Sequence, residues 1–369
     1  MSSPNIWRKL VGPLVVLTIG VTFVVAPSGK SASPDDLIPL VTGLNGARGV
    51  SAGPLGLVAY TEIDGTFSLL ATSGPLAGTT VELGSVPANF IAPAIAMGHM
   101  GQIYILTAGG APGTGAATLY RWVAGAGAPS VVADIAAYQV TDPDPYNTNG
   151  PPEESNPFGV AALHDSVLVS DAAGNDLLRV YPNGSIVTVA RLKPRVVPVP
   201  DELPDTGFPP AGTPILAEGV ATSVTVGEDG YYYVGELRGF PSTPGTAEIW
   251  RIAPGSVNAI CDPAAPDTGP CQRFADGFTS IVSLSTGDDG SIYVVELVKG
   301  GWLQWEEEVV EPIGGLFRIP RGGGTAKELA PDQLILPGGV SVAGTKKTYV
   351  TGPVFGPGTL SRLRVPVGN

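Results

Sequence analysis

The sequence has few of the residues that most often carry out catalysis. Its 369 residues include only two histidines, His99 and His164, and both fall in short turns between predicted strands. This scarcity argues against a histidine-ligated zinc site and against a Ser-His-Asp triad. The sequence also lacks a phosphate-binding loop or dinucleotide fingerprint between a strand and a helix, so no nucleotide cofactor is predicted.

Positive charge is scarce as well. Lys and Arg together number 20 against 33 Asp and Glu, which gives a formal net charge of −13. Such a protein should repel nucleic acid and anionic membrane surfaces, so we expect no nucleic-acid partner. Cations or neutral molecules suit it better as ligands.

Cysteine occurs only twice, at Cys261 and Cys271, within a short loop rich in Pro and Gly. An even count in an exported chain favours a disulfide between them. The alternative is a reactive thiol, which needs a His or Lys neighbour that the surrounding sequence does not provide. No cysteine lies near the N-terminus to carry a lipid anchor.

The N-terminus has the pattern of an export signal. Arg8 and Lys9 precede an uncharged apolar stretch over residues 10–26, and small residues follow over 28–33. We therefore predict a signal segment over 1–33 and one secreted domain over 34–369. The alternative is an uncleaved anchor helix, because the apolar stretch is about long enough to cross a bilayer. Only in that case do we expect contact with a membrane.

No long amphipathic helix is evident, but Gly (51) and Pro (37) are abundant between short runs of Val, Ile, Leu and Tyr. This pattern predicts many short strands joined by tight turns. Two segments, 219–237 and 279–297, share an alternating strand, a turn that ends in Asp-Gly, and a second strand that ends in Glu-Leu. The Asp-Gly pair supplies the positive φ angles that a tight hairpin requires.

Weaker copies of this unit begin near residues 49, 94, 156 and 338, and each copy continues into a further strand pair. Units of four strands are the size of a propeller blade, so we predict an all-β, six-bladed β-propeller. A seven-bladed ring with one degenerate blade and an open solenoid are the alternatives. The apolar stretch around residues 38–43 precedes the first hairpin, and we expect it to add an outer strand to the last blade.

Four stretches in these units resemble the ScyD/ScyE family of exported β-propellers. They are ESNPFGV (154–160), the segment 170–184, the segment 222–241 with its GEDG turn, and the segment 277–297 with its GDDG turn. The resemblance extends over essentially the whole mature chain. It implies a six-bladed propeller, similar to NHL-repeat and gluconolactonase-like proteins at the level of the fold, without a settled activity.

Long segments between the strands mark a candidate functional face, because long loops in a compact domain usually carry function. We expect all four of them on one face, called the top, opposite the tight turns that join the first two strands of each blade. These segments are 134–156, 193–218, 254–278 and 297–314. Trp302 and Trp305, in the last segment, lie on a predicted short helical lid and could line a ligand pocket. The alternative, which is more common for such residues, is that they pack against the rim.

The mouth of the central channel on the top face should be acidic. The residues expected to meet there lie at the start of a first strand or at the end of a second strand: Glu154, Asn156, Asp171, Glu236 and Glu296. Oxygen ligands of this kind suit Ca²⁺ or another divalent cation, and Arg238 is expected to point outward along its loop. The alternative is that such Asp and Asn residues only stabilise turns by bonding backbone amides.

The sequence therefore leaves open whether the protein is an enzyme. One hypothesis is a secreted propeller that binds a small molecule, a glycan or a protein on its top face. Another is a metal-dependent, lactonase-like hydrolase or oxidative enzyme with its site at the channel mouth. A third is a purely structural or interaction module.

Overall fold

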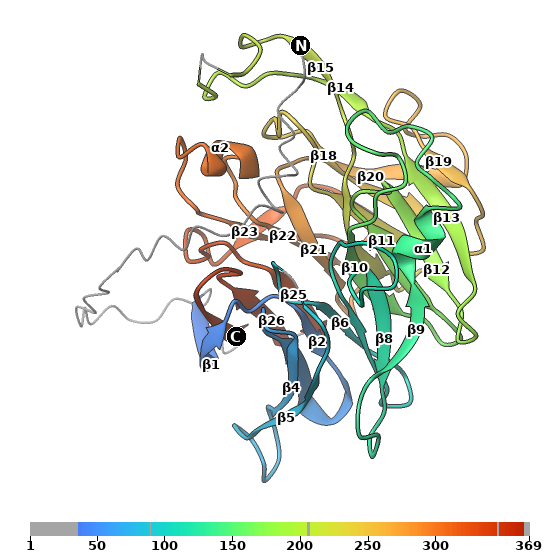
Figure 1. Cartoon of the computed structure of the whole chain (residues 1–369). Helices are drawn as coiled ribbons and strands as arrows, with labels where there is room; N and C mark the ends of the chain where they lie inside the picture. Colours follow the sequence, from blue (N-terminus) through green and yellow to red (C-terminus); the bar gives the residue numbers. More distant parts are fainter. Residues whose placement is uncertain (1–35, 89, 205–206, 345–346, 365–369) are drawn as a thin grey trace, which may run out of the picture.

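The computed structural model describes residues 36–88, 90–204, 207–344 and 347–364. In this part of the chain, six twisted sheets surround a central axis and form a β-propeller (Figure 1). The first three blades consist of β2 (Val50–Ala52), β3 (Leu57–Thr61), β4 (Thr66–Ala71) and β5 (Thr80–Ser85); β6 (Ala94–Met97), β7 (Ile103–Leu106), β8 (Thr118–Trp122) and β9 (Ser130–Asp134); and β10 (Pro157–Ala162), β11 (Val167–Asp171), β12 (Asp176–Val180) and β13 (Ile186–Leu192).

The other three blades follow the same antiparallel order. They consist of β16 (Ala221–Val226), β17 (Tyr232–Glu236), β18 (Ala247–Ile252) and β20 (Cys271–Phe278); β21 (Ile281–Thr286), β22 (Ile292–Glu296), β23 (Gly315–Ile319) and β24 (Lys327–Leu329); and β25 (Gly339–Ala343), β26 (Lys347–Gly352), β27 (Pro357–Leu363) and β1 (Leu37–Asn45). Within a blade we call the strands A to D, from the axis outward. The prediction of six four-stranded blades is confirmed.

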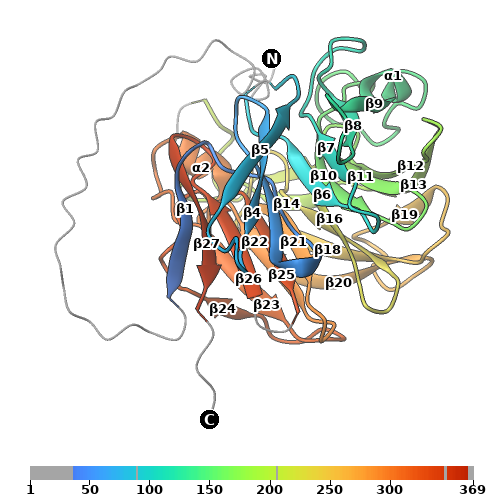
Figure 2. The ribbon, with the colours of Figure 1, turned by 90° about the horizontal axis from the view of Figure 1, so that it is seen from below.

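The ring closes through the first strand of the described chain. β1 pairs antiparallel with β27, so one blade combines both ends of the domain, as predicted for the stretch around residues 38–43. Figure 2 shows β1, in blue, beside the red strand β27. The strand A of each blade lies beside the strand A of the next, which places these six strands around the axis.

The Asp-Gly turns have the geometry that the sequence predicts. Gly230 has φ of +77°, and the Asp229 carboxylate accepts a hydrogen bond from the Tyr231 amide at 3.1 Å. Asp229 also pairs with Arg251 on strand C at 2.9 Å, so the turn is held to its own blade. These A–B turns define the bottom face, and His99 and His164 lie in two of them with ring centroids 5.9 Å apart.

Apolar side chains fill the space between neighbouring blades. Leu168 and Leu177 of the third blade share one buried cluster with Val234 and Trp250 of the fourth. Similar clusters join the second blade to the third and the fourth to the fifth. Because each blade buries both of its faces in this way, the orientation of its strands and of their loops is fixed by the ring.

The disulfide between Cys261 and Cys271 is present, as predicted, and both residues are fully buried. Its loop is not on the top face, however, which corrects the expectation for segment 254–278. Cys271 pairs with Ile252, and Ile252 pairs with Tyr232 beside the A–B turn. A C–D connection in an antiparallel blade must return to the same end as its A–B turn.

The same loop also contributes a strand to its neighbour. β19 (Ala259–Cys261) pairs in parallel with β13, so the third blade gains a fifth strand from the fourth. Ala259, Cys261 and Cys271 belong to the buried cluster between these two blades. The disulfide therefore holds a contact between blades in addition to closing a loop.

Three long connections do lie on the top face, because they follow a strand B or a strand D. The segment 134–156 contains helix α1 (Ile135–Gln139), and 193–218 contains the hairpin of β14 (Arg195–Pro198) and β15 (Pro214–Ala217). The segment 297–314 contains helix α2 (Trp302–Glu306), the short helix that the sequence predicted. In the part of the chain that the structure describes, no helix is long and apolar enough to span a membrane. The predicted signal segment, 1–33, lies outside the described residues.

Candidate functional site

A cavity of about 250 Å³ opens at the top end of the central axis. Every blade contributes to its wall. The lining residues lie just before a strand A, at the start of a strand A, or in the connection that follows a strand B. The lining residues are Arg48, Phe90, Ile91, Asn156, Phe158, Ala172, Val220, Thr222, Leu237, Val282, Leu297, Trp302, Trp305, Glu306, Gly338, Val354 and Phe355. The site is thus assembled from segments that are far apart in the sequence.

The wall of this cavity is mainly apolar and aromatic, which corrects the expectation of an acidic mouth. Helix α2 places Trp302 and Trp305 one turn apart in the wall. The indole of Trp302 donates to the Arg238 carbonyl at 3.1 Å, so this ring is fixed in place. Trp305 stacks against Phe355 of the last blade, with ring centroids 6.3 Å apart. A small molecule with apolar surface fits such a wall better than a hydrated cation does.

Arg48 is a charged group in this wall that no sequence motif indicated. It precedes β2 and is only 3% exposed, although it lines the cavity. Its guanidinium donates to the carbonyls of Ala92, at 2.9 Å, and Phe158, and it lies 3.7 Å from the centroid of the Phe158 ring. Burial lowers the pKa of Arg48 to about 9, so the group is still charged at neutral pH.

Three of the predicted metal ligands occupy equivalent positions in successive blades. Asp171, Glu236 and Glu296 each end a strand B and pair with the first residue of strand A. All three side chains are buried. The register therefore confirms that the repeat places a carboxylate at the same point of three blades.

Two of these carboxylates accept a backbone N–H that lies just before strand A of the same blade. Asp171 accepts from the Asn156 amide at 2.7 Å, and Glu296 accepts from the Thr279 amide at 2.6 Å. In the first blade the hydroxyl of Thr61 has the same role and accepts from the Gly49 amide at 2.9 Å. This repeated contact satisfies a backbone donor at the point where each of these three blades begins.

Asp171 is further enclosed by its own turn. Its oxygens accept from the Ser155 hydroxyl at 2.6 Å and from the amides of Ala173 and Gly174, both at 3.1 Å. Burial raises the pKa of Asp171, and these hydrogen bonds act in the opposite direction. Asn156 uses its side-chain oxygen to accept from the Gly109 amide of the preceding blade, at 2.9 Å.

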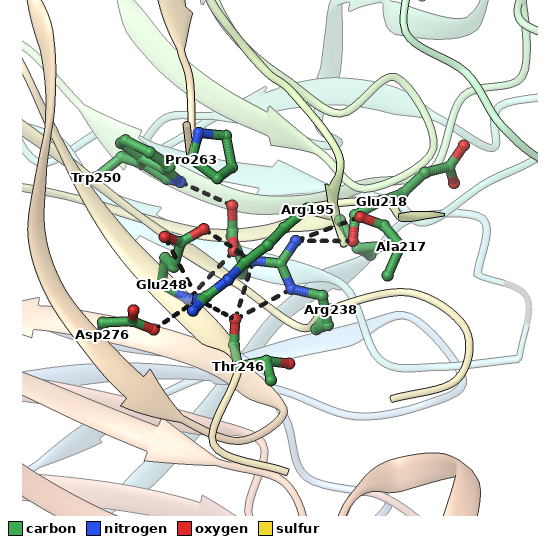
Figure 3. Close-up of polar contacts among 12 residues, drawn as sticks. Arg195, Ala217, Glu218, Arg238, Thr246, Glu248, Trp250, Pro263 and Asp276 are labelled. Atoms are coloured by element: carbon green, nitrogen blue, oxygen red, sulfur yellow. Dashed lines mark hydrogen bonds and ion pairs between the residues drawn. The ribbon is translucent and has the colours of Figure 1, made fainter. Parts of the chain in front are cut away.

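Glu236 is part of a buried network of charges in the fourth blade. Figure 3 labels its partners Arg238 and Trp250, together with Glu248. Glu236 accepts from the Trp250 indole at 2.7 Å and pairs with Arg238, which also reaches Glu248 at 2.9 Å. The expectation that Arg238 points outward is wrong: the residue is 1% exposed and held between these two carboxylates. Burial still raises the pKa of Glu236, to about 7, against the opposing effect of Arg238.

The buried position of Arg238 follows from contacts that sequence order does not reveal. Its guanidinium also donates to the carbonyl of Thr246, at 3.0 Å, and this contact ties the loop after β17 to the start of β18. Arg195 and Arg273 approach Glu248 from the outside of the same network. Two buried carboxylates require such cationic partners, since unpaired charges are costly in the interior.

The predicted ligands are therefore brought together only in part. Asn156 and Asp171 are in contact, and Asn156 alone of the five lines the cavity, whereas Glu154 is exposed on the segment before β10. Among the described residues, no three His, Cys, Asp or Glu side chains gather as a metal ion would require. Binding of Ca²⁺ or another divalent cation at these five residues stays a prediction.

Solved structures match this chain at low sequence identity. The PQQ-bound aldose sugar dehydrogenase of Streptomyces coelicolor aligns over 90% of this chain and 100% of its own, with a TM-score of 0.51 and 13% identity. A gluconolactonase of Xanthomonas campestris aligns over 89% of each chain, with a TM-score of 0.55 and 12% identity. A protein of unknown function from Bacteroides thetaiotaomicron gives 0.52 and 11%, over 89% of this chain and 72% of its own.

No model of a protein family matches the sequence, and no curated protein matches it either. The resemblance to the ScyD/ScyE family is thus not established by these comparisons. These three structural likenesses are below 25% identity, and at that level they show a shared fold and nothing more. The chain is accordingly a six-bladed β-propeller, a fold that it shares with this gluconolactonase.

Proposed function

We propose that this protein is a secreted binding propeller that holds a small, largely apolar molecule in the cavity on its top face. Export rests on the N-terminal pattern of Arg8, Lys9 and the apolar stretch over 10–26. Membership of the ScyD/ScyE family is part of the same proposal and rests on the segments 154–160, 170–184, 222–241 and 277–297.

The observation that carries the proposal is the aromatic cavity at the channel mouth. Phe158, Trp302, Trp305 and Phe355 line a space of about 250 Å³ that all six blades surround. A concave apolar site with a few polar groups is the usual form of a small-molecule site. A glycan or a protein would instead need a broader polar or flat surface.

The alternative function is a lactonase-like hydrolase or oxidative enzyme. Its site would need groups that activate water or transfer protons at the cavity. Among the described lining residues the ionisable side chains are Arg48 and Glu306. The buried carboxylates Asp171, Glu236 and Glu296 already accept hydrogen bonds within their own blades. We therefore favour a binding function over a catalytic one.

The test uses N-phenyl-1-naphthylamine, a neutral apolar probe whose fluorescence rises in an apolar site. We expect the full chain to bind it, and Trp305→Ala or Phe355→Ala to weaken binding at least about tenfold, since each removes an aromatic wall. Met100→Ala is the matched control, because Met100 is 87% exposed in a turn on the bottom face. Melting temperatures of the variants verify that each is folded.

A wild-type chain that does not enhance the fluorescence would contradict the proposal. Equal affinity in Trp305→Ala, Phe355→Ala and Met100→Ala would also contradict it, because the probe would then bind elsewhere.

A further inference from the structure

Arg48 differs from two other buried arginines of this propeller in its partners. Arg238 lies between Glu236 and Glu248, and Arg191 pairs with Asp142 at 2.6 Å. Arg48 is as deeply buried. Among the residues that the structure describes, however, it contacts the Ala92 carbonyl before β6, the Phe158 carbonyl in β10 and the Phe158 ring, and no carboxylate. A buried guanidinium without a counter-charge is unfavourable unless something compensates it.

The surroundings hold this guanidinium in one place. Its two carbonyl acceptors, Ala92 and Phe158, lie in the segments that begin the second and third blades. The carbonyl of Arg48 itself accepts a hydrogen bond from the Thr351 hydroxyl of the last blade. Four blades therefore fix the position of one cation before any ligand binds, which reduces the entropy lost on binding.

The Arg48 guanidinium has N–H donors that its contacts with the protein do not use. A guanidinium has five N–H groups, and the two hydrogen bonds to carbonyls use two of them. Asn156, in the same wall, uses its oxygen to accept from the Gly109 amide, which directs its NH₂ group elsewhere. The described residues offer that NH₂ group no acceptor, so both side chains bring N–H donors to one cavity.

Arg48 and Phe158 also form the floor of the cavity. Both line a second, smaller space of about 70 Å³ further down the channel, together with Val282 and Gly338. The stacked pair thus lies at the boundary between the two spaces. A ligand in the upper cavity would have its deepest atoms against the guanidinium and its upper part between the aromatic walls.

We propose that the ligand is a planar aromatic carboxylate, whose carboxylate group accepts hydrogen bonds from Arg48 and Asn156 while its ring lies against Phe158, Trp302 and Trp305. This inference rests on the proposed function, because it assigns the ligand class of the same cavity. An Arg-carboxylate contact is charge-assisted and can be bidentate, which gives it both strength and orientation. The aromatic walls supply the apolar contact for the rest of the molecule.

The test compares two probes of the same shape, 2-naphthoate and 2-naphthamide, by isothermal titration calorimetry on the full chain. The wild type should bind 2-naphthoate at least about tenfold more tightly, as expected for one charge-assisted contact in a buried site. Arg48→Met keeps an unbranched side chain and removes the charge. It should abolish the preference, because it weakens the binding of 2-naphthoate more than that of 2-naphthamide.

Asn156→Asp is the second variant, and it is nearly isosteric. The new carboxylate can still accept from the Gly109 amide, but it replaces the NH₂ donor with a negative charge. We expect it to weaken 2-naphthoate binding more than 2-naphthamide binding. This variant keeps the test decisive if Arg48→Met does not fold.

The outcomes separate the two proposals. If both probes bind the wild type equally, or if both variants keep the preference, the carboxylate inference is wrong and the apolar binding function stands. If neither probe binds at millimolar concentration although N-phenyl-1-naphthylamine does, the inference alone is wrong. If none of the three binds, the proposed function and the inference are both wrong.

Discussion

Replacing Glu296 with Gln should change how the stability of this propeller depends on pH. Glu296 ends β22, is 5% exposed, and accepts a hydrogen bond from the Thr279 amide. Burial raises the pKa of this carboxyl to about 8, helped by Glu328 and opposed by Lys299 and the Thr279 hydrogen bond. Lys299 itself pairs with Glu328 and Asp332, so it compensates Glu296 only weakly.

The direction in which stability changes with pH depends on whether the folded or the unfolded chain holds the proton of Glu296. The unfolded chain loses the proton of Glu296 near pH 4.5, whereas the folded protein keeps it up to about pH 8. Between these values the folded state binds more protons, so its free energy of unfolding falls as the pH rises and then levels off above pH 8. The two pKa values differ by about 3.5 (about 8 minus 4.5). A pKa difference of one corresponds to about 1.4 kcal/mol, so the free energy of unfolding falls by at most about 5 kcal/mol over this pH range.

Glu296→Gln keeps an oxygen that can accept from the Thr279 amide and cannot ionise. Relative to the wild type, its free energy of unfolding should therefore rise steadily from pH 5 to pH 8. Guanidinium unfolding followed by tryptophan fluorescence at four pH values measures this difference. Glu228→Gln, in an exposed turn of the neighbouring blade, is the control and should give a flat difference. A flat or falling difference for Glu296→Gln would refute the reasoning.

Other parts of the structure make separate predictions. Arg238→Met leaves Glu236 and Glu248 without their shared cation and should lower the free energy of unfolding by about 3–5 kcal/mol. Arg251→Met, in a surface pair, should lower it by about 1 kcal/mol or less. Equal losses for the two variants in denaturant unfolding would contradict this. Replacing both cysteines with Ala should lower the free energy of unfolding by about 2–4 kcal/mol and speed amide hydrogen exchange in β13. Unchanged exchange in β13 would show that β19 stays paired with it without the disulfide. If Glu154, Asn156, Asp171, Glu236 and Glu296 bind a divalent cation, then Ca²⁺, Mg²⁺ or Mn²⁺ added after a chelator should raise the melting temperature, and no change with any of the three would remove that hypothesis.

The blades could be predicted because their signals are local. An alternating strand, an Asp-Gly turn and a second strand lie within about twenty residues of each other in each strong copy, for example over 219–237. The closing strand β1 could also be predicted, because a propeller repeat that starts with strand A leaves the last blade short of a strand. The N-terminal signal falls outside the described residues, so it stays a prediction.

The face on which a loop lies is harder to predict, because it depends on counting strands correctly. The length of segment 254–278 favours the top face, but β18 and β20 are strands C and D of one blade, so their connection returns to the bottom. The parallel pairing of β19 with β13 could not be predicted at all. It joins residues about seventy positions apart through a strand of three residues, too short for a pattern.

The carboxylates depart from the expected cluster for a different reason. The sequence shows that Glu236 and Glu296 occupy equivalent positions in two blades. It does not show whether their side chains turn toward the axis or toward the backbone of their own blade. In the structure the repeated residue has a repeated role, since Asp171 and Glu296, like Thr61, accept an N–H that precedes strand A. A structural contact that several blades share explains why a residue recurs, without any shared ligand.

Function in such a ring should be sought at positions that do not recur from blade to blade. Positions that recur from blade to blade maintain the blades, whereas a single ligand on the axis needs groups that differ between blades. Arg48 precedes the first strand A, and helix α2 with Trp302 and Trp305 is inserted after one strand B, in the fifth blade. Both break the repeat, and both line the end of the axis where the three long top-face connections lie. The asymmetric residues at this mouth, rather than the repeated acidic ones, are therefore the ones whose replacement should change ligand binding while leaving the ring intact.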